Sequence, residues 1–248
     1  MADCKNHHTL TIHPPPIIVT AWLSLMLTTT VAHAELPSQV SEALAGFTTD
    51  APSGWAYTLT TRRGGEISVE RYDPSATDGH QWTLLLHNGK SASAEEIDRY
   101  SRYRVTTNAT TPRATFRRGD INTTSLTLIS RTATEEEYTC AFRSDVDDPL
   151  LNRLQLRLWI AIQPARITRY SLHLQTPYSP ILGMKVANLD VTVNLSPPEP
   201  NRPPLPLTSH SIFHGRFLLF KSVDEEVDVS YSDFEKRVPT ISPDGIHR

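Results

Sequence analysis

Apolar and polar side chains alternate with a period of two through most of the chain between residues 55 and 231. Residues 154–162 give the clearest case, because leucine or isoleucine occupies every even position and polar, aromatic or small residues occupy the odd ones. Successive side chains of a β-strand point to opposite faces, so such a segment predicts a strand with one apolar face. The pattern predicts about ten strands, in segments 55–60, 67–70, 82–86, 126–128, 138–142, 154–162, 170–174, 189–195, 213–219 and 227–231.

Turn-forming residues separate several of these segments. Arg62–Gly65 lies between the first two segments, and Asn88–Gly89 follows the third. Glycine adopts positive φ angles at no steric cost, which tight hairpin turns require. The sequence therefore predicts antiparallel hairpins at these two positions.

Helical patterns are few. Val40, Ala43, Leu44 and Phe47 share one helical face, with Ser38 as the predicted N-cap. Residues 93–103 form the second predicted helix, in which Ser93 is the N-cap and glutamates occupy the first turn.

About ten one-sided strands cannot lie flat in water, because exposing their apolar faces would cost tens of kcal/mol at about 25 cal/mol per Å². Two sheets could stack as a sandwich, or one sheet could close into a barrel. A strongly curved antiparallel sheet could instead wrap its apolar concave side around the two short helices. Two helices would only partly fill such a trough, which would leave a pocket for an apolar ligand.

The N-terminus has the features of a secretory signal peptide. Lys5 precedes an apolar run at residues 17–31, and Ala32-His33-Ala34 supplies a small-x-small cleavage pattern. The run is shorter than the roughly 20 residues of a membrane-spanning helix; an uncleaved anchor is the alternative. We therefore expect a cleaved signal peptide (1–34), one β domain (35–238) and a flexible tail (239–248), with the proline-rich stretch 197–206 as a surface connection between strands.

Composition narrows the function classes. Lys and Arg number 24 against 27 Asp and Glu, a formal net charge of −3 that gives no basic surplus for binding nucleic acid. The chain has two cysteines, too few for a disulfide scaffold or a Cys₄ zinc module. Cys4 lies in the predicted signal peptide. Cys140 lies between Tyr138 and Phe142 on one face of a predicted strand, where we expect it to be buried and inert.

The order of elements resembles a known family. The predicted signal peptide, the helix segment Val40–Phe47 and the strand order that follows resemble the periplasmic lipoprotein-localisation-factor superfamily (LolA/LolB-like). The late strands Gly215–Lys221 and Val227–Phe234 resemble the closing strands of uncharacterised exported proteins grouped near that superfamily. The resemblance implies a mainly β (α+β) fold: an unclosed antiparallel half-barrel of about ten strands, with helices as a lid on the concave side, that holds acyl chains. No functional arginine of that family aligns with a position here.

Catalytic and metal-binding motifs are scarce. His210 and His214 have the i, i+4 spacing of a helical zinc site, but in a strand this spacing is about 13 Å and cannot chelate one ion. Asp145, Asp147 and Asp148 lack the glycine and closing glutamate of a calcium loop. We expect residues 135–137 and 224–226, both acidic, to be solvated turns. The sequence thus predicts no enzyme, no cofactor and no metal.

The predicted function is a soluble periplasmic binding or carrier protein for a lipid or acylated ligand, with an envelope protein as a second partner and no nucleic acid. The alternatives are a non-catalytic envelope module with a packed core and no ligand, and an outer-membrane barrel, whose strands would need about ten residues each. The predicted apolar lining of the ligand pocket consists of Trp55, Tyr57, Leu59, Trp82, Leu84, Leu86, Leu156, Leu158, Ile160, Phe213 and Phe217.

Overall fold

The computed structural model describes residues 36–49, 54–76, 80–110, 115–197, 203–217 and 221–237, with the backbone alone for 103–110. The chain divides into two compact units, residues 1–34 and 35–248, and all described residues belong to the second. The predicted signal peptide (1–34) and the predicted tail (239–248) lie outside the described residues.

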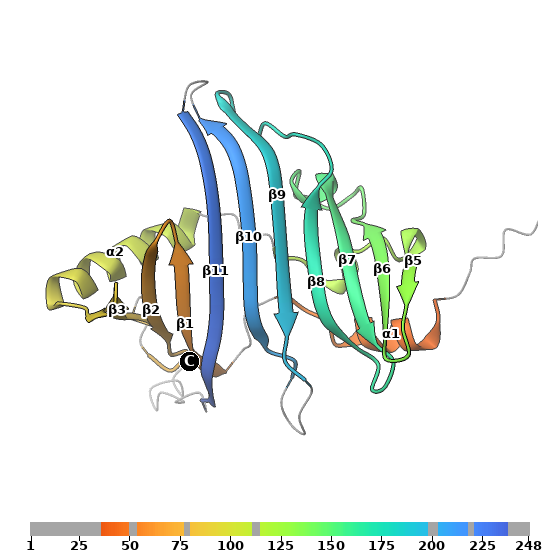
Figure 1. Ribbon diagram of the computed structural model, residues 1–248, viewed down its shortest axis with the longest axis horizontal. Coiled ribbons are helices and arrows are strands. Elements are labelled where there is room, and N and C mark those ends of the chain that lie inside the picture. Colours follow the sequence, from red (N-terminus) through yellow and green to blue (C-terminus); the bar gives the residue numbers. More distant parts are fainter. Residues whose placement is uncertain are drawn as a thin grey trace, which may run out of the picture. The chain divides into compact units, whose positions relative to one another are not determined.

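Eleven antiparallel strands form one sheet in the order β4-β3-β2-β1-β11-β10-β9-β8-β7-β6-β5 (Figure 1). The described part of the chain also contains two α-helices and three short 3₁₀ turns. The elements are α1 (Ser38–Ala45), β1 (Trp55–Arg63), β2 (Glu66–Tyr72), β3 (Trp82–His87), β4 (Lys90–Ser91), α2 (Ala94–Thr110), η1 (Arg118–Asp120), η2 (Thr123–Ser125), β5 (Thr127–Arg131), β6 (Glu135–Ala141), η3 (Leu151–Arg153), β7 (Leu154–Ala161), β8 (Arg166–Leu174), β9 (Met184–Leu195), β10 (Pro206–Phe217) and β11 (Lys221–Lys236).

The sheet is strongly curved and unclosed, so the predicted half-barrel is confirmed. β5 to β11 form a continuous meander, and β1 pairs with β11, the last strand within the described residues. β4 and β5 are the two free edges. Both helices lie on the concave side: α1 packs against β8, and α2 packs against β3 (Figure 1).

Both predicted hairpin turns are present. Gly64 and Gly65 have φ angles of 56° and 84° between β1 and β2. Asn88 and Gly89, at 51° and 76°, connect β3 to β4. Two successive positive φ angles match the right-handed twist of paired strands, so these residues set the register of each hairpin.

The two helices begin differently. Ser93 caps α2 as predicted, because its hydroxyl accepts the amide N–H of Glu96 at 3.3 Å while the Glu96 carboxylate accepts the Ser93 amide N–H at 2.8 Å. This reciprocal pair is a capping box. The predicted Ser38 cap is wrong: Pro37 occupies the N-cap position without a side-chain hydrogen bond, and Ser38 is the first helical residue.

The hydrophobic core lies between α1 and strands β6 to β9. Val40 and Leu44 of α1 are fully buried against the even-numbered residues of β7, whose alternation follows the predicted pattern. Phe116 is also fully buried, with its ring centroid 5.0 Å from that of Phe142. Cys140 is buried as predicted, and burial raises the pKa of its thiol to about 12.

Two acidic segments are strands and not the predicted solvated turns. Residues 135–137 belong to β6, where Glu136 is buried and accepts hydrogen bonds from Gln39 of α1 (2.8 Å) and from the Tyr138 hydroxyl (2.7 Å). Arg131 forms an ion pair with the same carboxylate. Residues 224–226 belong to β11. Through its hydrogen bond from Gln39, which lies 97 positions earlier in the chain, Glu136 therefore joins α1 to the sheet.

Candidate ligand-binding site

The predicted lining residues occupy three different environments. Leu156, Leu158 and Ile160 are 0% exposed and belong to the core beneath α1. At the other extreme, Phe217 is 41% exposed at the end of β10. The remaining residues lie on β1, β3 and β10, and are buried or partly buried: Trp55, Tyr57, Leu59, Trp82, Leu84, Leu86 and Phe213.

A cavity of 670 Å³ lies between α2 and the concave face of β1, β2 and β3. Of the predicted lining residues, Leu84 borders it. The other lining residues carry polar or charged side chains, which differ from the residues that the sequence predicts, although more apolar than polar surface faces the cavity. The lining residues are Thr61, Arg63, Glu66, Ser68, Glu70, Leu84, His87, Glu96, Arg99 and Tyr100.

Glu70 is the most deeply buried charged group of this cavity, with 6% of its surface exposed. The Tyr100 hydroxyl of α2 donates to one carboxylate oxygen at 2.6 Å, and the Ser68 hydroxyl donates to the other at 3.1 Å. A buried carboxylate needs such donors to offset its lost hydration. The contact also ties α2 to β2.

The mouth of the cavity carries further charged pairs. Arg63 donates through Nε to Glu225 of β11 at 2.8 Å. His87 Nδ1 lies 3.6 Å from Glu96 on the first turn of α2. The hydrogen bonds from Ser93 hold the pKa of the Glu96 carboxyl below its usual range. Cationic and anionic side chains thus alternate around the opening, a surface suited to a ligand's polar or zwitterionic group.

An aromatic cluster lies at one end of the same strands. Tyr57 is central, with ring centroids of Tyr72, Tyr231 and Phe234 at 5.1, 5.9 and 5.9 Å. Trp82 stacks beside Tyr72 at 5.0 Å. Tyr57 of β1 thus contacts Tyr231 and Phe234 of β11, although the two strands are far apart in the sequence. The cluster fills the concave face where β1, β2, β3 and β11 meet.

A strip of partly exposed apolar side chains crosses the concave face between the core and the cavity. Residues paired across strands share a face, and Val191, Ser211, Val227 and Arg63 form one such row from β9 to β1. The adjacent row contains Ser209 between two valines. We call this surface the apolar strip; it consists of Leu189, Val191, Phe213, Val227, Val229 and Tyr231, all partly exposed.

The small serines of β10 shape the strip. Ser209 and Ser211 lie between the valines of β9 and those of β11, so β10 presents short side chains at these two positions and a large one at Phe213. At its β9 side the strip continues into the core, because Val191 pairs with the buried Leu172. At its β11 side it reaches Thr61 and Arg63 of the cavity wall.

Sequence reasoning missed the polar cavity because it inverted the faces of β2. In segment 67–70 the period-two pattern predicts that the apolar face, formed by Ile67 and Val69, points inward, but Ile67 is 38% exposed. Glu70 pairs with the buried Leu59, and Ser68 pairs with Thr61, so the polar residues of β2 point into the cavity. When the polar side chains of an alternating strand are the buried ones, the period-two pattern does not reveal it, because the alternation is the same for either orientation.

Comparisons with known proteins identify no relative. No family model matches the chain. No curated protein matches it. A solved structure of an isomerase-inactive variant of GphF DH1 aligns over 80% of this chain and 81% of its own, with 9% identity and a TM-score of 0.16. At that score the alignment carries no argument about fold or function. Neither described helix has the length and hydrophobicity needed to cross a membrane.

Proposed function

We propose that the protein is a periplasmic carrier or binding protein for an amphiphilic ligand, a lipid or an acylated molecule, held on the concave face. The apolar part of the ligand lies along the apolar strip, and its polar group enters the cavity beneath α2. The observation that carries the proposal is the continuity of partly exposed apolar side chains from the core to a polar cavity. The predicted signal peptide is the reason for placing this function in the periplasm.

An amphiphile needs an apolar surface for its chain and hydrogen-bonding groups for its head group, and we assign these roles to the apolar strip and to the cavity. Each methylene removed from water contributes about 0.8 kcal/mol, so eight methylenes on the strip would contribute about 6 kcal/mol before the cost of ordering the chain. The charged lining of the cavity offers hydrogen-bond donors and acceptors to a head group within 670 Å³, a volume typical of small-molecule sites. A purely apolar ligand would leave these charges unsolvated.

Ligand binding is tested with the purified protein and an environment-sensitive fluorescent fatty acid. Val227→Asn places an amide in the apolar strip, which costs about 1–2 kcal/mol of binding free energy and weakens binding of the probe about 5- to 30-fold. The matched control is Ile212→Asn on the opposite face of the neighbouring strand, which we expect to leave the affinity within about twofold of the unsubstituted protein.

Mass spectrometry of organic extracts of the native protein provides a second measurement. We expect a co-purified lipid or acylated molecule at near-stoichiometric amount in the unsubstituted protein, reduced in the Val227→Asn variant. Absence of any extractable amphiphile, combined with probe affinity that both variants leave unchanged, would refute the proposal. That result would favour the alternative of an envelope interaction module, which the filled core beneath α1 also suits.

A further inference from the structure

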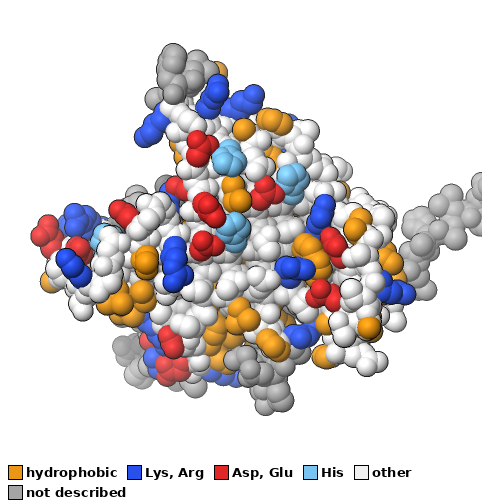
Figure 2. Space-filling view, in the orientation of Figure 1, with side chains coloured by type: hydrophobic (Ala, Val, Ile, Leu, Met, Phe, Trp, Pro, Cys, Tyr) orange, Lys and Arg blue, Asp and Glu red, His pale blue; other side chains and the backbone are white. Residues whose placement is uncertain are grey.

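The convex face of the sheet carries three histidine–aspartate pairs on its longest strands. His173 pairs with Asp190 across β8 and β9, and His210 and His214 each pair with an aspartate across β10 and β11. Figure 2 shows this face, where histidines lie among acidic side chains. In every pair the ring nitrogen nearest the carboxylate is Nδ1.

A carboxylate at Nδ1 decides where the imidazole proton lies. The carboxylate oxygen can only accept, so in the neutral ring Nδ1 carries the proton and donates it. Asp228 holds His210 in this way, at 2.8 Å. The lone pair of Nε2 is then available on the opposite side of the ring. This arrangement, in which a carboxylate orients a histidine through Nδ1, recurs behind metal-binding histidines.

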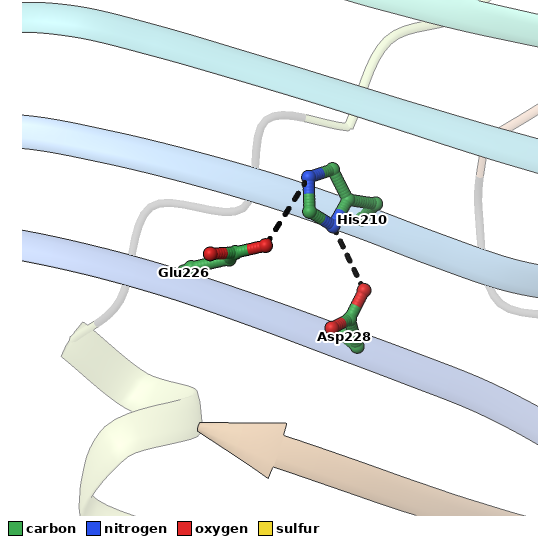
Figure 3. A group of neighbouring side chains, drawn as sticks. All are labelled: His210, Glu226 and Asp228. Carbon is green, nitrogen blue, oxygen red and sulfur yellow. Dashed lines mark hydrogen bonds and ion pairs between the residues drawn. The ribbon is translucent and has the colours of Figure 1, made fainter. Parts of the chain in front are cut away.

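His210 differs from the other two histidines in what faces Nε2. Glu226 of β11 places a carboxylate oxygen 3.9 Å from this nitrogen (Figure 3). Potential ligand atoms of His210, Glu226 and Asp228 all lie within 4.8 Å of one another. In the described part of the chain, His173 and His214 each have one carboxylate within ion-pair distance.

We propose that His210 Nε2 and the Glu226 carboxylate bind a divalent transition-metal ion such as Zn²⁺, with Asp228 as the residue that orients the imidazole. Zinc accepts imidazole nitrogen and carboxylate oxygen at about 2.0–2.2 Å, so two ligands at the tetrahedral angle lie about 3.3 Å apart. The present 3.9 Å requires only a small rotation of Glu226, whose side chain is 68% exposed. Water would complete the coordination.

The surrounding charges favour a cation on balance. Glu226 and Asp228 are carboxylates of the site itself, Asp190 lies in the same cross-strand row as Glu226, and Asp224 lies in the next row of that face. Arg62 opposes binding, because it lies opposite Asp228 on β1. Because Arg62 is positively charged, replacing it with a neutral residue should strengthen metal binding, whereas replacing a ligand should weaken it.

The test is isothermal titration calorimetry, in which tag-free protein is titrated with zinc chloride in a non-chelating buffer. Exposed histidines elsewhere in the chain can also bind zinc, so the decisive quantity is the number of bound zinc equivalents that each substitution removes. His210→Ala should remove one equivalent, and Glu226→Gln and Asp228→Asn should each weaken it about tenfold or more. Arg62→Gln should strengthen it about threefold.

The other two pairs supply matched controls. His173→Ala and His214→Ala each remove an imidazole from the same face with the same Nδ1 pairing. We expect both variants to keep the zinc equivalent that His210→Ala removes, with an affinity within about twofold of the unsubstituted protein. A zinc-dependent rise in melting temperature in the unsubstituted protein, missing in His210→Ala, gives an independent readout. The proposal would be overturned if His210→Ala left the number of bound zinc equivalents unchanged, or if all three histidine variants lost the same amount of binding.

Discussion

The buried thiol of Cys140 makes the stability of the protein depend on alkaline pH. The Cys140 side chain is 4% exposed, and burial raises the pKa of its thiol from 9.0 to about 12. Below pH 9 the folded and unfolded chains both carry the protonated thiol. Between pH 9 and 12 the unfolded chain loses this proton and the folded chain keeps it, so the free energy of unfolding falls as pH rises.

The magnitude follows from the two pKa values. The slope approaches 1.4 kcal/mol per pH unit once the unfolded thiol is ionised, which amounts to a loss of about 1 kcal/mol between pH 8 and pH 10. Urea unfolding followed by circular dichroism at pH 8, 9 and 10 measures this loss. The difference between the unsubstituted protein and Cys140→Ala isolates the thiol, because all other titrating groups are common to both proteins.

The alanine variant has its own constant cost from the lost sulfur contacts, which does not vary with pH. We therefore expect its unfolding free energy to fall less steeply than that of the unsubstituted protein. Parallel pH profiles for the two proteins would refute the reasoning, because they would mean that Cys140 ionises equally in the folded and unfolded chains.

Two further predictions concern elements that hold the concave side together. Phe116→Ala removes a fully buried ring that contacts Phe47, Phe142 and Tyr170; it should cost about 3–5 kcal/mol and lower the melting temperature by about 10 °C, whereas alanine at the fully exposed Leu182 should change stability by less than about 0.5 kcal/mol. Ser93→Ala removes the cap of α2 and should cost about 1 kcal/mol, seen as faster amide hydrogen exchange in the first turn of that helix; unchanged exchange would contradict the capping geometry.

The positions of strands could be predicted from the sequence where one face of the strand packs in the core and the other face contacts water. β7 is the clearest example, since every even residue is buried beneath α1 or its neighbours. The tight turns were also predictable, because glycine and asparagine at positive φ are local signals. These features depend on residues within a few positions of one another, and the sequence displays them directly.

The polar cavity depends on contacts between distant residues and was not predictable from the pattern. Glu70 faces inward because Tyr100, thirty positions later, donates to its carboxylate. Glu136 is buried because Gln39 and Arg131 reach it from other elements. In each case the hydrogen-bond partners offset the free-energy cost of removing a carboxylate from water. The period-two pattern places every carboxylate on the solvent face, because it takes no account of such partners.

The pairing of β1 with β11 has a consequence for how the protein is assembled. The six hairpin contacts from β5 to β11 join neighbours in the chain, but the ion pair of Arg63 with Glu225 joins residues separated by 162 positions. During synthesis from the N-terminus, β1 to β4 emerge first, and the edge of β1 that β11 covers stays unpaired until β11 is made. An unpaired strand edge is a template for pairing with other chains, so the long separation between β1 and β11 exposes the early strands to aggregation in that interval.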